Sequence, residues 1–421
     1  MKTLVLITSQ FPFGTGESFI ESELPVLVRN YEKTIIIAQN TSCRKTRIIP
    51  DYLVLYRYSP STSLSGFLYM PFLLILNFRT ISELFKEEVA FRRSIDYSLT
   101  INNSLFLLKR IIKSVQLRNF IRKVVYKENV TQNIVFYSYW LKTGAHALAM
   151  LDYSNSVRIS RAHGSDIYEE KTQSGYLPLL KYSALNLDAI FFVSRHGREY
   201  FIKKTKTDKS QYLVSYLGVE KPDFEITGTN RSDRFVIVSC SNMVPLKRID
   251  LIIYALEQVR CDKEIEWLHF GGGILKNELE KLAESRLQPL RRISFKFMGQ
   301  YPNEKLLKYY SQNYINLFIN TSSTEGIPVS IMEAQIYGIP VIATDTGGVK
   351  ELVTEGTGSL LPVDISPVDL ARLIEHYINL SEEETDRIRI KAMKNSEINF
   401  SSNTNYNDFI SKVNSISATA R

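Results

Sequence analysis

The stretch that decides the fold is INTSSTEGIPVSIMEAQIYGIPVIATDTGG, residues 319–348. An apolar run of buried-strand length ends near its beginning, and a helical pattern follows after a loop. Pro328 suits the first helical position, Gly338 suits the cap after the last turn, and Pro340 prevents continuation. A second apolar run, PVIATD, comes next. The segment therefore predicts a strand, loop, helix and strand in succession, as in a parallel α/β sheet.

The loop of this unit is suited to bind an anion. Unpaired N–H groups at the start of the helix point back at the sheet edge, and the helix dipole also favours negative charge there. Glu325 lies in the loop and Glu333 lies one to two turns into the helix. Like charges repel, so these carboxylates would not bind the anion itself, but they can accept hydrogen bonds from sugar hydroxyls beside it. A nucleotide sugar has hydroxyls on both sides of its diphosphate.

Apolar runs of strand length recur along the 421 residues and alternate with helical patterns. The runs are TLVLI, TIIIAQN, NIVFYSY, VRISRAHG and AIFFVS in the first half, and RFVIVSCS, EWLHFGGG, ISFKFMGQ, INLFINTSS and PVIATD in the second. A polar stretch with three Gly or Pro residues, YLGVEKPDFEITGTNRSD, separates the halves. We therefore expect α/β domains at 1–218 and 234–395, a linker at 219–233, and a helical segment, 396–421, able to pack back on the first domain.

The basic charge is confined to the first half of the chain. Residues 1–220 hold 29 basic and 18 acidic side chains, a net charge of +11, whereas the remaining residues hold 23 and 26, a net charge of −3. The run SLFLLKRIIKSVQLRNFIRKVVYK, residues 104–127, has seven basic residues and no acidic one. It predicts an amphipathic helix on an anionic membrane surface; the alternative is a basic surface helix packed on its own domain. RNA binding is disfavoured because no aromatic stacking motif accompanies the charge.

The cysteines and two apolar segments indicate where in the cell the protein is located. The cysteines Cys43, Cys240 and Cys261 are odd in number and widely spaced, which favours a reducing compartment and no zinc site. The apolar segment Leu64–Phe78 is too short to span a bilayer and is interrupted by Gly66 and Pro71, but it can lie on one. Leu4 to Ile7 is too short for a signal peptide and reads as a first buried strand.

The spacing E-x7-E within EGIPVSIMEA closely resembles the retaining glycosyltransferases of family 4. The resemblance implies a GT-B fold, in which two Rossmann-like doubly wound domains face each other across a cleft. In that family the first glutamate contacts the donor sugar and the second contacts the nucleotide ribose. Those roles fall here to Glu325 and Glu333, with the backbone of Gly326, Ile327, Pro328 and Val329 near the sugar and phosphates.

Further segments resemble the same family in the same order. HFGGG and MGQ look like loops around the nucleotide base, which points to Gly272, Gly299 and Gln300, and TGGVKEL resembles the segment after the next strand. PFGTGESFIESEL resembles the Gly-rich loop that faces the diphosphate and acceptor, with Gly14 and Gly16 as the positions of close approach. RAHGSD resembles the strand-end histidine, which implies that His163 lies near the donor sugar or the transferring bond. YSYWLKTGAHA resembles polysaccharide-assembly members in particular.

The chain departs from the family pattern at one position. Members often carry an arginine followed five positions later by a lysine, both on the diphosphate; here SNMVPLKRID has Asn242 in place of the arginine, then Lys247. Asn donates hydrogen bonds without charge. Either Arg248 compensates, or the diphosphate is bound with one cation fewer, or the activity is reduced; we favour compensation by Arg248.

Each of these residues also has an alternative interpretation. Glu325 could be a solvated loop carboxylate, His163 a core histidine with satisfied hydrogen bonds, and Lys247 and Arg248 plain charges at a helix start. Gly271–Gly273 lacks the G-x-G-x-x-G spacing, so a dehydrogenase fingerprint is not supported.

We therefore expect a cytoplasmic glycosyltransferase, peripheral to the inner face of a membrane. It would move a sugar, with retention, from a nucleotide diphosphate donor, a UDP-sugar being favoured, to a lipid-linked glycan of a capsule, O-antigen or exopolysaccharide. Lys247 would stabilise the leaving diphosphate. The sequence has no D-x-D motif, so we expect no metal and no cofactor. The alternatives are a GT-B nucleotide-sugar epimerase and a membrane-surface protein with a degenerate site.

Overall fold

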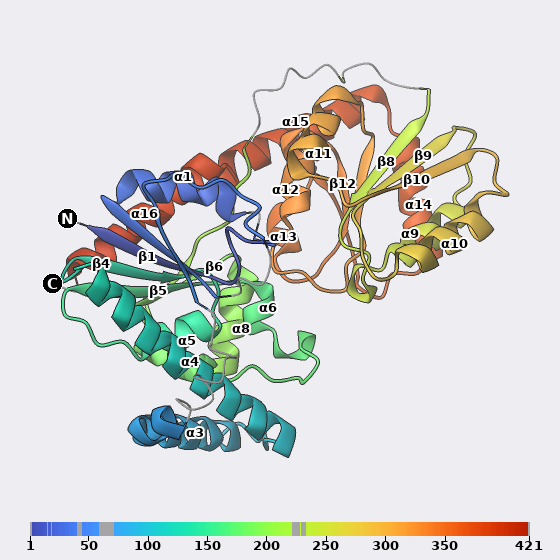
Figure 1. The fold of residues 1–421 in the computed structure, drawn as a ribbon. Coiled ribbons are helices and arrows are strands. Elements are labelled where there is room, and N and C mark those ends of the chain that lie inside the picture. The colour runs from blue at the N-terminus through green and yellow to red at the C-terminus, as the bar shows by residue number, and fades with distance from the viewer. Residues whose placement is uncertain are drawn as a thin grey trace. The chain divides into compact units, whose positions relative to one another are not determined.

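The computed structural model describes residues 2–14, 16–17, 19–39, 44–58, 71–220, 228 and 233–419. It consists of two compact units, Met1–Tyr216 together with Tyr406–Arg421, and Leu217–Asn405. Figure 1 shows that each unit has its own sheet with helices on both faces. Most of the predicted linker, 219–233, lies outside the described residues.

The first unit is built on a seven-stranded parallel sheet. Its strands are β1 (Thr3–Thr8), β2 (Lys33–Ala38), β3 (Val54–Arg57), β4 (Ile134–Ser138), β5 (Ser156–Ala162), β6 (Ala189–Phe192) and β7 (Tyr212–Val214), in the order β3-β2-β1-β4-β5-β6-β7. The order reverses direction at β1, beside which β4 pairs in parallel. In such a sheet the carboxyl ends of the strands form the ligand-binding edge.

Helices cover both faces of this sheet (Figure 1). The helices of the first unit are α1 (Ile20–Asn30), α3 (Phe78–Arg93), α4 (Ile101–Lys127), α5 (Thr143–Ala149), α6 (Gly164–Ile167), α7 (Leu180–Asn186), α8 (Arg195–Thr205) and α16 (Ser402–Thr419), with a short 3₁₀ helix, Glu169–Lys171; α3 packs on α4 and α7 and not on the sheet. One face packs against α1 and the last helix, whose Tyr406 and Phe409 join the same apolar cluster as Leu4 and Leu24. The carboxyl-terminal residues 406–421 are therefore part of the first unit.

The second unit repeats the architecture with six parallel strands. They are β8 (Phe235–Cys240), β9 (Ile265–Phe270), β10 (Ile293–Gly299), β11 (Leu317–Asn320), β12 (Val341–Thr344) and β13 (Gly358–Leu361), in the order β10-β9-β8-β11-β12-β13. The helices are α9 (Ile249–Gln258), α10 (Lys276–Leu287), α11 (Asn303–Gln312), α12 (Val329–Ile336), α13 (Val349–Leu352), α14 (Pro367–Ile378) and α15 (Glu382–Asn399), with a 3₁₀ turn, Pro245–Lys247. Both units are Rossmann-like α/β domains, which confirms the predicted fold class.

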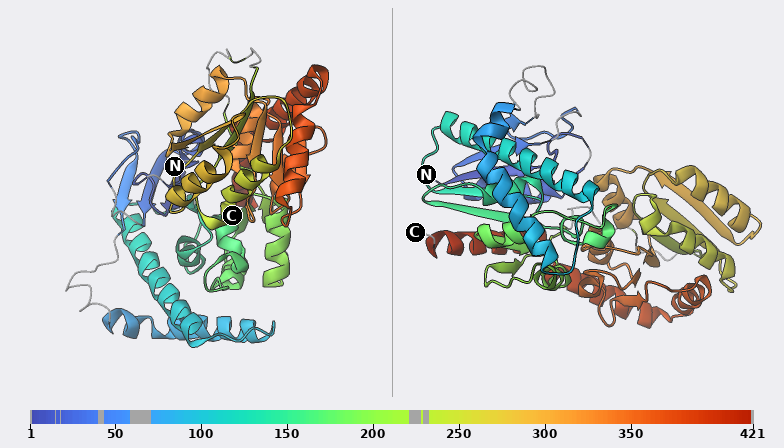
Figure 2. Two further views of the ribbon diagram at one scale, coloured as in Figure 1. Left: turned by 90° about the vertical axis from the view of Figure 1, so that its right-hand side faces the viewer. Right: turned by 90° about the horizontal axis from the view of Figure 1, so that it is seen from below.

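The basic run 104–127 lies in α4, and the structure uses its apolar side chains inside the unit. Leu107, Ile111 and Ile121 are fully buried. Two of its cations are also engaged within the unit: Arg110 donates to Thr143 Oγ1 at 2.6 Å and Arg118 donates to Asn77 Oδ1 at 2.6 Å. The packing therefore agrees with the alternative interpretation, a basic helix packed on its own domain. Figure 2 shows that α3 and the amino-terminal part of α4 extend away from the sheet.

Part of α4 still faces solvent. The exposed side chains are Ile101, Asn102, Leu105, Leu108, Lys109, Lys113, Arg122, Lys123, Tyr126 and Lys127. In the predicted segment Leu64–Phe78, residues up to 70 lie outside the described residues, while Ile75, Leu76 and Phe78 are exposed. None of the described helices is both long and apolar enough to cross a bilayer. Cys43 lies outside the described residues, and Cys240 and Cys261 are free thiols.

A fully buried ion pair joins the central strands of the first unit to α1. Arg161 on β5 donates from Nη2 to Glu23 Oε1 at 3.0 Å and from Nε to the Tyr137 hydroxyl at 2.8 Å. That hydroxyl donates to the same carboxylate at 2.9 Å, and Arg161 Nη1 donates to the Ser215 carbonyl at 3.1 Å. The network holds α1, β4, β5 and the end of β7 in one arrangement.

We expect Glu23→Ala to destabilise the first unit by about 3–5 kcal/mol, because it leaves the Arg161 charge buried without its partner. Urea unfolding followed by circular dichroism measures the change. The matched control is Glu83→Ala, which removes an exposed ion pair to Arg79 and should cost below about 1 kcal/mol. Equal costs for the two variants would contradict the role given to the buried pair.

Candidate active site

The loop between β11 and α12 places Glu325 at the carboxyl edge of the second sheet. Asn320, the last residue of β11, donates from Nδ2 to Glu325 Oε1 at 3.3 Å and accepts from the Ser322 amide at 3.0 Å. The TGG segment after β12 packs directly on this loop, since a Cβ atom at Gly347 would lie 2.0 Å from the Glu325 carbonyl oxygen. Glycine is therefore required at 347, where φ is +60°.

Lys247 and Glu325 form an ion pair within this loop cluster. Lys247 Nζ lies 2.6 Å from Glu325 Oε1, and the two side chains are 19% and 11% exposed. The backbone is joined as well: Thr321 Oγ1 donates to the Lys247 carbonyl at 3.0 Å, and the Ser323 amide donates to the Leu246 carbonyl at 2.8 Å. The loops after β8 and β11 are thus held together, with the cation and the carboxylate in contact.

Glu333 is buried on α12, with 9% of its surface exposed. Asn303, the first residue of α11, donates from Nδ2 to Glu333 Oε1 at 2.6 Å. Burial raises the pKa of the Glu333 carboxyl to about 7, although the Asn303 hydrogen bond acts in the opposite direction. At neutral pH this side chain is therefore divided between its ionised and protonated forms.

Two of the three glycines after β9, Gly271 and Gly273, are explained by close backbone packing. A Cβ at Gly271, where φ is +144°, would lie 1.9 Å from the Ser241 carbonyl oxygen. The Gly271 amide donates to the Gly299 carbonyl at 2.9 Å, and a Cβ at Gly272 would lie 3.4 Å from Gln300 Oε1. The structure therefore brings the predicted base-side residues Gly272, Gly299 and Gln300 together at the ends of β9 and β10.

The residues around the family arginine position lie in the loop after β8. Asn242 is exposed there, and its carbonyl accepts from the Val244 amide at 2.9 Å. Arg248 adopts a left-handed backbone with φ of +50°, and its Nη1 donates to the carbonyl of Val363, beyond β13. Arg248 thus has a backbone partner in this structure, and its compensation for Asn242 stays a prediction.

In the first unit, His163 follows β5 directly and caps α6. It is nine-tenths buried, and burial lowers the pKa of its imidazole to about 4. The ring hydrogen-bonds the backbone of Tyr139, while Nε2 is buried with no partner among the described residues. A neutral imidazole has one N–H donor and one lone-pair acceptor, and Nε2 is the ring nitrogen that is left available to a ligand.

Aromatic side chains that the sequence did not single out surround this imidazole. Ring centroids of Trp140, Tyr139 and Phe19 lie 4.5, 5.2 and 5.8 Å from that of His163. Asp166 is fully buried and accepts from the amides of Leu141 and His163 at 3.1 and 3.2 Å. Two sequence features could have predicted these residues: the Trp in YSYW and the Asp in HGSD, each of which comes just after a predicted strand.

Gly14 and Gly16 lie in the loop between β1 and α1. The Gly14 carbonyl accepts from Thr46 Oγ1 and Arg47 Nη1, and its amide donates to the Arg44 carbonyl at 3.1 Å. The side-chain amide of Gln10 fills the space beside Gly16. These glycines and His163 belong to the first unit, whereas the other predicted site residues belong to the second.

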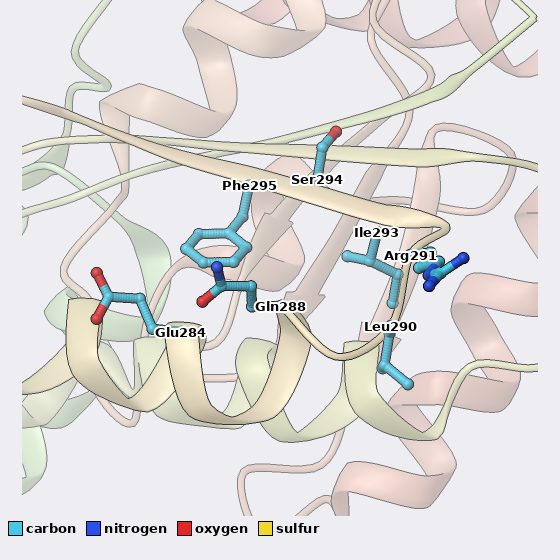
Figure 3. A pocket seen from close by; sticks show the side chains of 7 residues that line it. All are labelled: Glu284, Gln288, Leu290, Arg291, Ile293, Ser294 and Phe295. Atoms are coloured by element: carbon cyan, nitrogen blue, oxygen red, sulfur yellow. The ribbon is translucent and has the colours of Figure 1, made fainter.

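Two further observations concern ligand sites. A groove of about 430 Å³ runs between the end of α10 and edge strand β10, lined by Gln288 and Phe295 among others (Figure 3). None of the predicted site residues lines it. Within the described ranges, no group of three or more His, Cys, Asp or Glu side chains could hold a metal ion; the expectation that no metal is needed stays a prediction.

Residues 221–395 match the family "Glycosyl transferases group 1", so the second unit carries a domain of that group. A GDP-mannose-dependent monoacylated alpha-(1-6)-phosphatidylinositol monomannoside mannosyltransferase of Corynebacterium glutamicum is 32% identical over 171 residues, 38% of this chain and 41% of that protein. The Vi polysaccharide biosynthesis protein VipC/TviE of Salmonella typhi is 36% identical over 118 residues, 27% and 19% of the two chains.

The fold of the whole chain resembles solved structures. The crystal structure of Anabaena Alr3699/HepE in complex with UDP has a TM-score of 0.66 at 18% identity and covers 99% of this chain and 100% of that one. The chain spans about half the length of the curated relatives it first matches. The matches therefore show a GT-B-type fold and a group 1 glycosyltransferase domain.

We expect Glu333→Gln to raise the thermal midpoint at pH 8 and to change it little at pH 5. The folded-state pKa of Glu333, about 7, exceeds the ordinary value of 4.5, so stability falls as pH rises from 4.5 to 7 and is constant above. The loss is on the order of 3 kcal/mol, and an uncharged Gln avoids it while still accepting from Asn303. The exposed neighbour Glu304→Gln is the control, and a pH-independent gain at Glu333 would contradict the shifted pKa.

Proposed function

We propose that the protein is a retaining glycosyltransferase that moves a sugar from a nucleotide diphosphate donor, with a UDP-sugar favoured, to a lipid-linked glycan. The observation that carries this proposal is the contact of Lys247 with Glu325 at the edge of a group 1 glycosyltransferase domain. It places a cation for phosphate and a carboxylate for sugar hydroxyls at one point of the sheet edge.

The Lys247–Glu325 ion pair favours a ligand that carries both an anionic group and hydroxyl groups. Lys247 and Glu325 satisfy each other, and both are largely buried. A ligand that drew away only Lys247 would cost a poorly solvated carboxylate its short contact with this cation, which is unfavourable. A nucleotide sugar replaces both partners at once, because its diphosphate takes Lys247 while its hydroxyls donate to Glu325. When the bond to the sugar breaks, Lys247 and the amides at the start of α12 stabilise the charge on the diphosphate.

The remaining site residues take binding roles in this proposal. Glu333 accepts the ribose hydroxyls, and these hydrogen bonds are strongest when its carboxyl group is ionised. His163 accepts a hydroxyl hydrogen of the donor sugar through Nε2. Its lowered pKa keeps the imidazole neutral near pH 7, so it does not act there as a general acid.

The names of the matched relatives support the acceptor class. One is a mannosyltransferase that acts on a phosphatidylinositol monomannoside, a glycolipid, and another belongs to Vi polysaccharide biosynthesis. A lipid-linked acceptor requires the enzyme to work at a membrane, and the basic side chains of α4 suit an anionic surface. We therefore place the protein on the inner face of the cytoplasmic membrane, in the assembly of a cell-surface polysaccharide.

We expect a UDP-sugar to raise the thermal midpoint in a panel of nucleotide sugars, because a ligand of the folded state stabilises it. Lys247→Ala should weaken donor affinity about 10- to 100-fold by removing a charge-assisted hydrogen bond. Glu325→Ala should abolish transfer, and Glu333→Ala should mainly raise the KM for the donor. Calorimetry and a transfer assay measure these effects.

The control for Lys247 is Lys350→Ala, an exposed lysine on α13. Wild-type transfer rates for both glutamate variants at limiting donor would refute the site assignment. Consumption of donor without acceptor, with an epimer as product, would favour the epimerase. No affinity for any nucleotide diphosphate would favour a degenerate site, for which Asn242 is the motivating observation.

We expect the protein to float with vesicles that contain phosphatidylglycerol and to be released by salt. Lys109→Ala with Lys113→Ala removes two exposed cations of α4 and should weaken binding by about 2 kcal/mol, since each basic group near the surface contributes about 1 kcal/mol. The matched control is Lys281→Ala with Lys305→Ala in the second unit. Flotation that depends on neither anionic lipid nor salt would contradict the membrane role.

A further inference from the structure

The carboxylate of Glu17 is enclosed by four N–H donors in the first unit. Its Oε1 accepts from the Ser9 amide at 2.8 Å and from the indole Nε1 of Trp140. Its Oε2 accepts from the amides of Gln10 and Phe11 at 2.7 and 2.6 Å. Glu17 is only 5% exposed. The loop after β1 therefore folds around a negatively charged group.

Such an arrangement selects an anion. Successive backbone amides that converge on one point form a concave site for negative charge, and hydrogen bonds to a carboxylate are shorter and stronger than those between neutral groups. Glu17 has φ of +60°, a region that non-glycine residues adopt rarely. The four hydrogen bonds offset that backbone cost and hold the carboxylate in this site.

Through Trp140 the carboxylate reaches the imidazole of His163. Glu17 lies in the loop between β1 and α1, while Trp140 lies 123 residues further along the chain, after β4. The Trp140 ring is the nearest ring to His163, at 4.5 Å between centroids. The indole N–H is held by Glu17, which fixes the ring plane against the imidazole.

We propose that Glu17 is a positioning residue: its carboxylate fills the anion site made by the amides of residues 9–11 and so holds Trp140 against His163. The consequence for sugar transfer rests on the proposed function. The consequence for the environment of Trp140 does not, and it can be measured on the protein without any substrate.

The chain has two tryptophans, Trp140 and Trp267, so Trp267→Phe leaves Trp140 as the single indole. In this background Glu17→Ala should shift the Trp140 emission, and sodium formate should restore it because a free carboxylate can occupy the emptied site. Sodium chloride at equal ionic strength should not restore it. The matched control, Glu21→Ala, removes a half-exposed carboxylate paired with Arg47 and should leave the Trp140 emission unchanged, with or without formate.

The variant Glu17→Gln tests the charge of the side chain separately from its size, because Gln is nearly as large as Glu but uncharged. The Gln side chain would fill the site but would set an NH₂ group against N–H donors, so the emission should shift and formate should not restore it. If Glu17→Ala does not fold, this variant decides alone. Wild-type emission from Glu17→Gln, or a shift in Glu17→Ala that formate leaves untouched, would overturn the proposal.

In the transfer assay, kcat of Glu17→Ala should fall about 10- to 100-fold, as expected when a group that orients the donor sugar is misplaced, and formate should recover part of it. Affinity for the nucleoside alone should be unchanged, because the residues assigned to the base and the ribose lie in the second unit. An unchanged kcat would overturn the proposed effect on transfer. If no donor is used by the wild-type protein, the proposed function fails, whereas the fluorescence experiment still decides the role of Glu17.

Discussion

In a parallel sheet the carboxyl ends of all the strands lie at one edge. This constraint brings together the candidate site residues of each unit, because most of them lie in loops that follow strands. In the second unit β8 and β11 are neighbours, so the loops that follow them meet and bring Lys247 to Glu325 across 78 residues. In the first unit β1, β4 and β5 are consecutive in the sheet, so the loops after them bring together Glu17, Trp140 and His163. Neither cluster depends on sequence proximity; each depends on strand order.

The strands that the sequence predicts are those with long apolar runs, and the strands it misses lie at sheet edges. β3, β7 and β13 are edge strands of three or four residues with half-exposed side chains, so they lack the continuous apolar run that marks a strand buried on both faces. The helix 329–336 could be predicted because Pro328 and Gly338 mark its two ends. The sequence also predicted the apolar face of α4. A sequence pattern alone does not determine whether such a face packs against lipid or against protein. In the structure Leu107 and Ile111 pack into an apolar cluster of their own unit.

At the candidate site the sequence pattern predicts the residue types but not their partners. The spacing of Glu325 and Glu333 follows from one helix and its preceding loop, so one local segment suffices to predict them. That Lys247 contacts Glu325 requires the order of β8 and β11, and the contact of Arg248 with the Val363 carbonyl joins residues 115 positions apart. The residues around His163 come from three separate loops, so no single sequence motif could have predicted that they lie together.

The same side chain therefore serves four purposes in this protein, and its surroundings decide which. Glu23 meets a buried guanidinium 138 residues away and stabilises the core. Glu17 meets backbone amides and an indole and fixes a loop. Glu325 meets an ammonium group that a ligand phosphate can bind in its place, so this pairing is exchangeable. Glu333 meets only a neutral amide in a buried setting, so its pKa rises and its charge becomes conditional on pH and on what binds beside it. A carboxylate held by fixed groups inside the protein stabilises structure, whereas one left with an exchangeable or uncharged partner is available for binding.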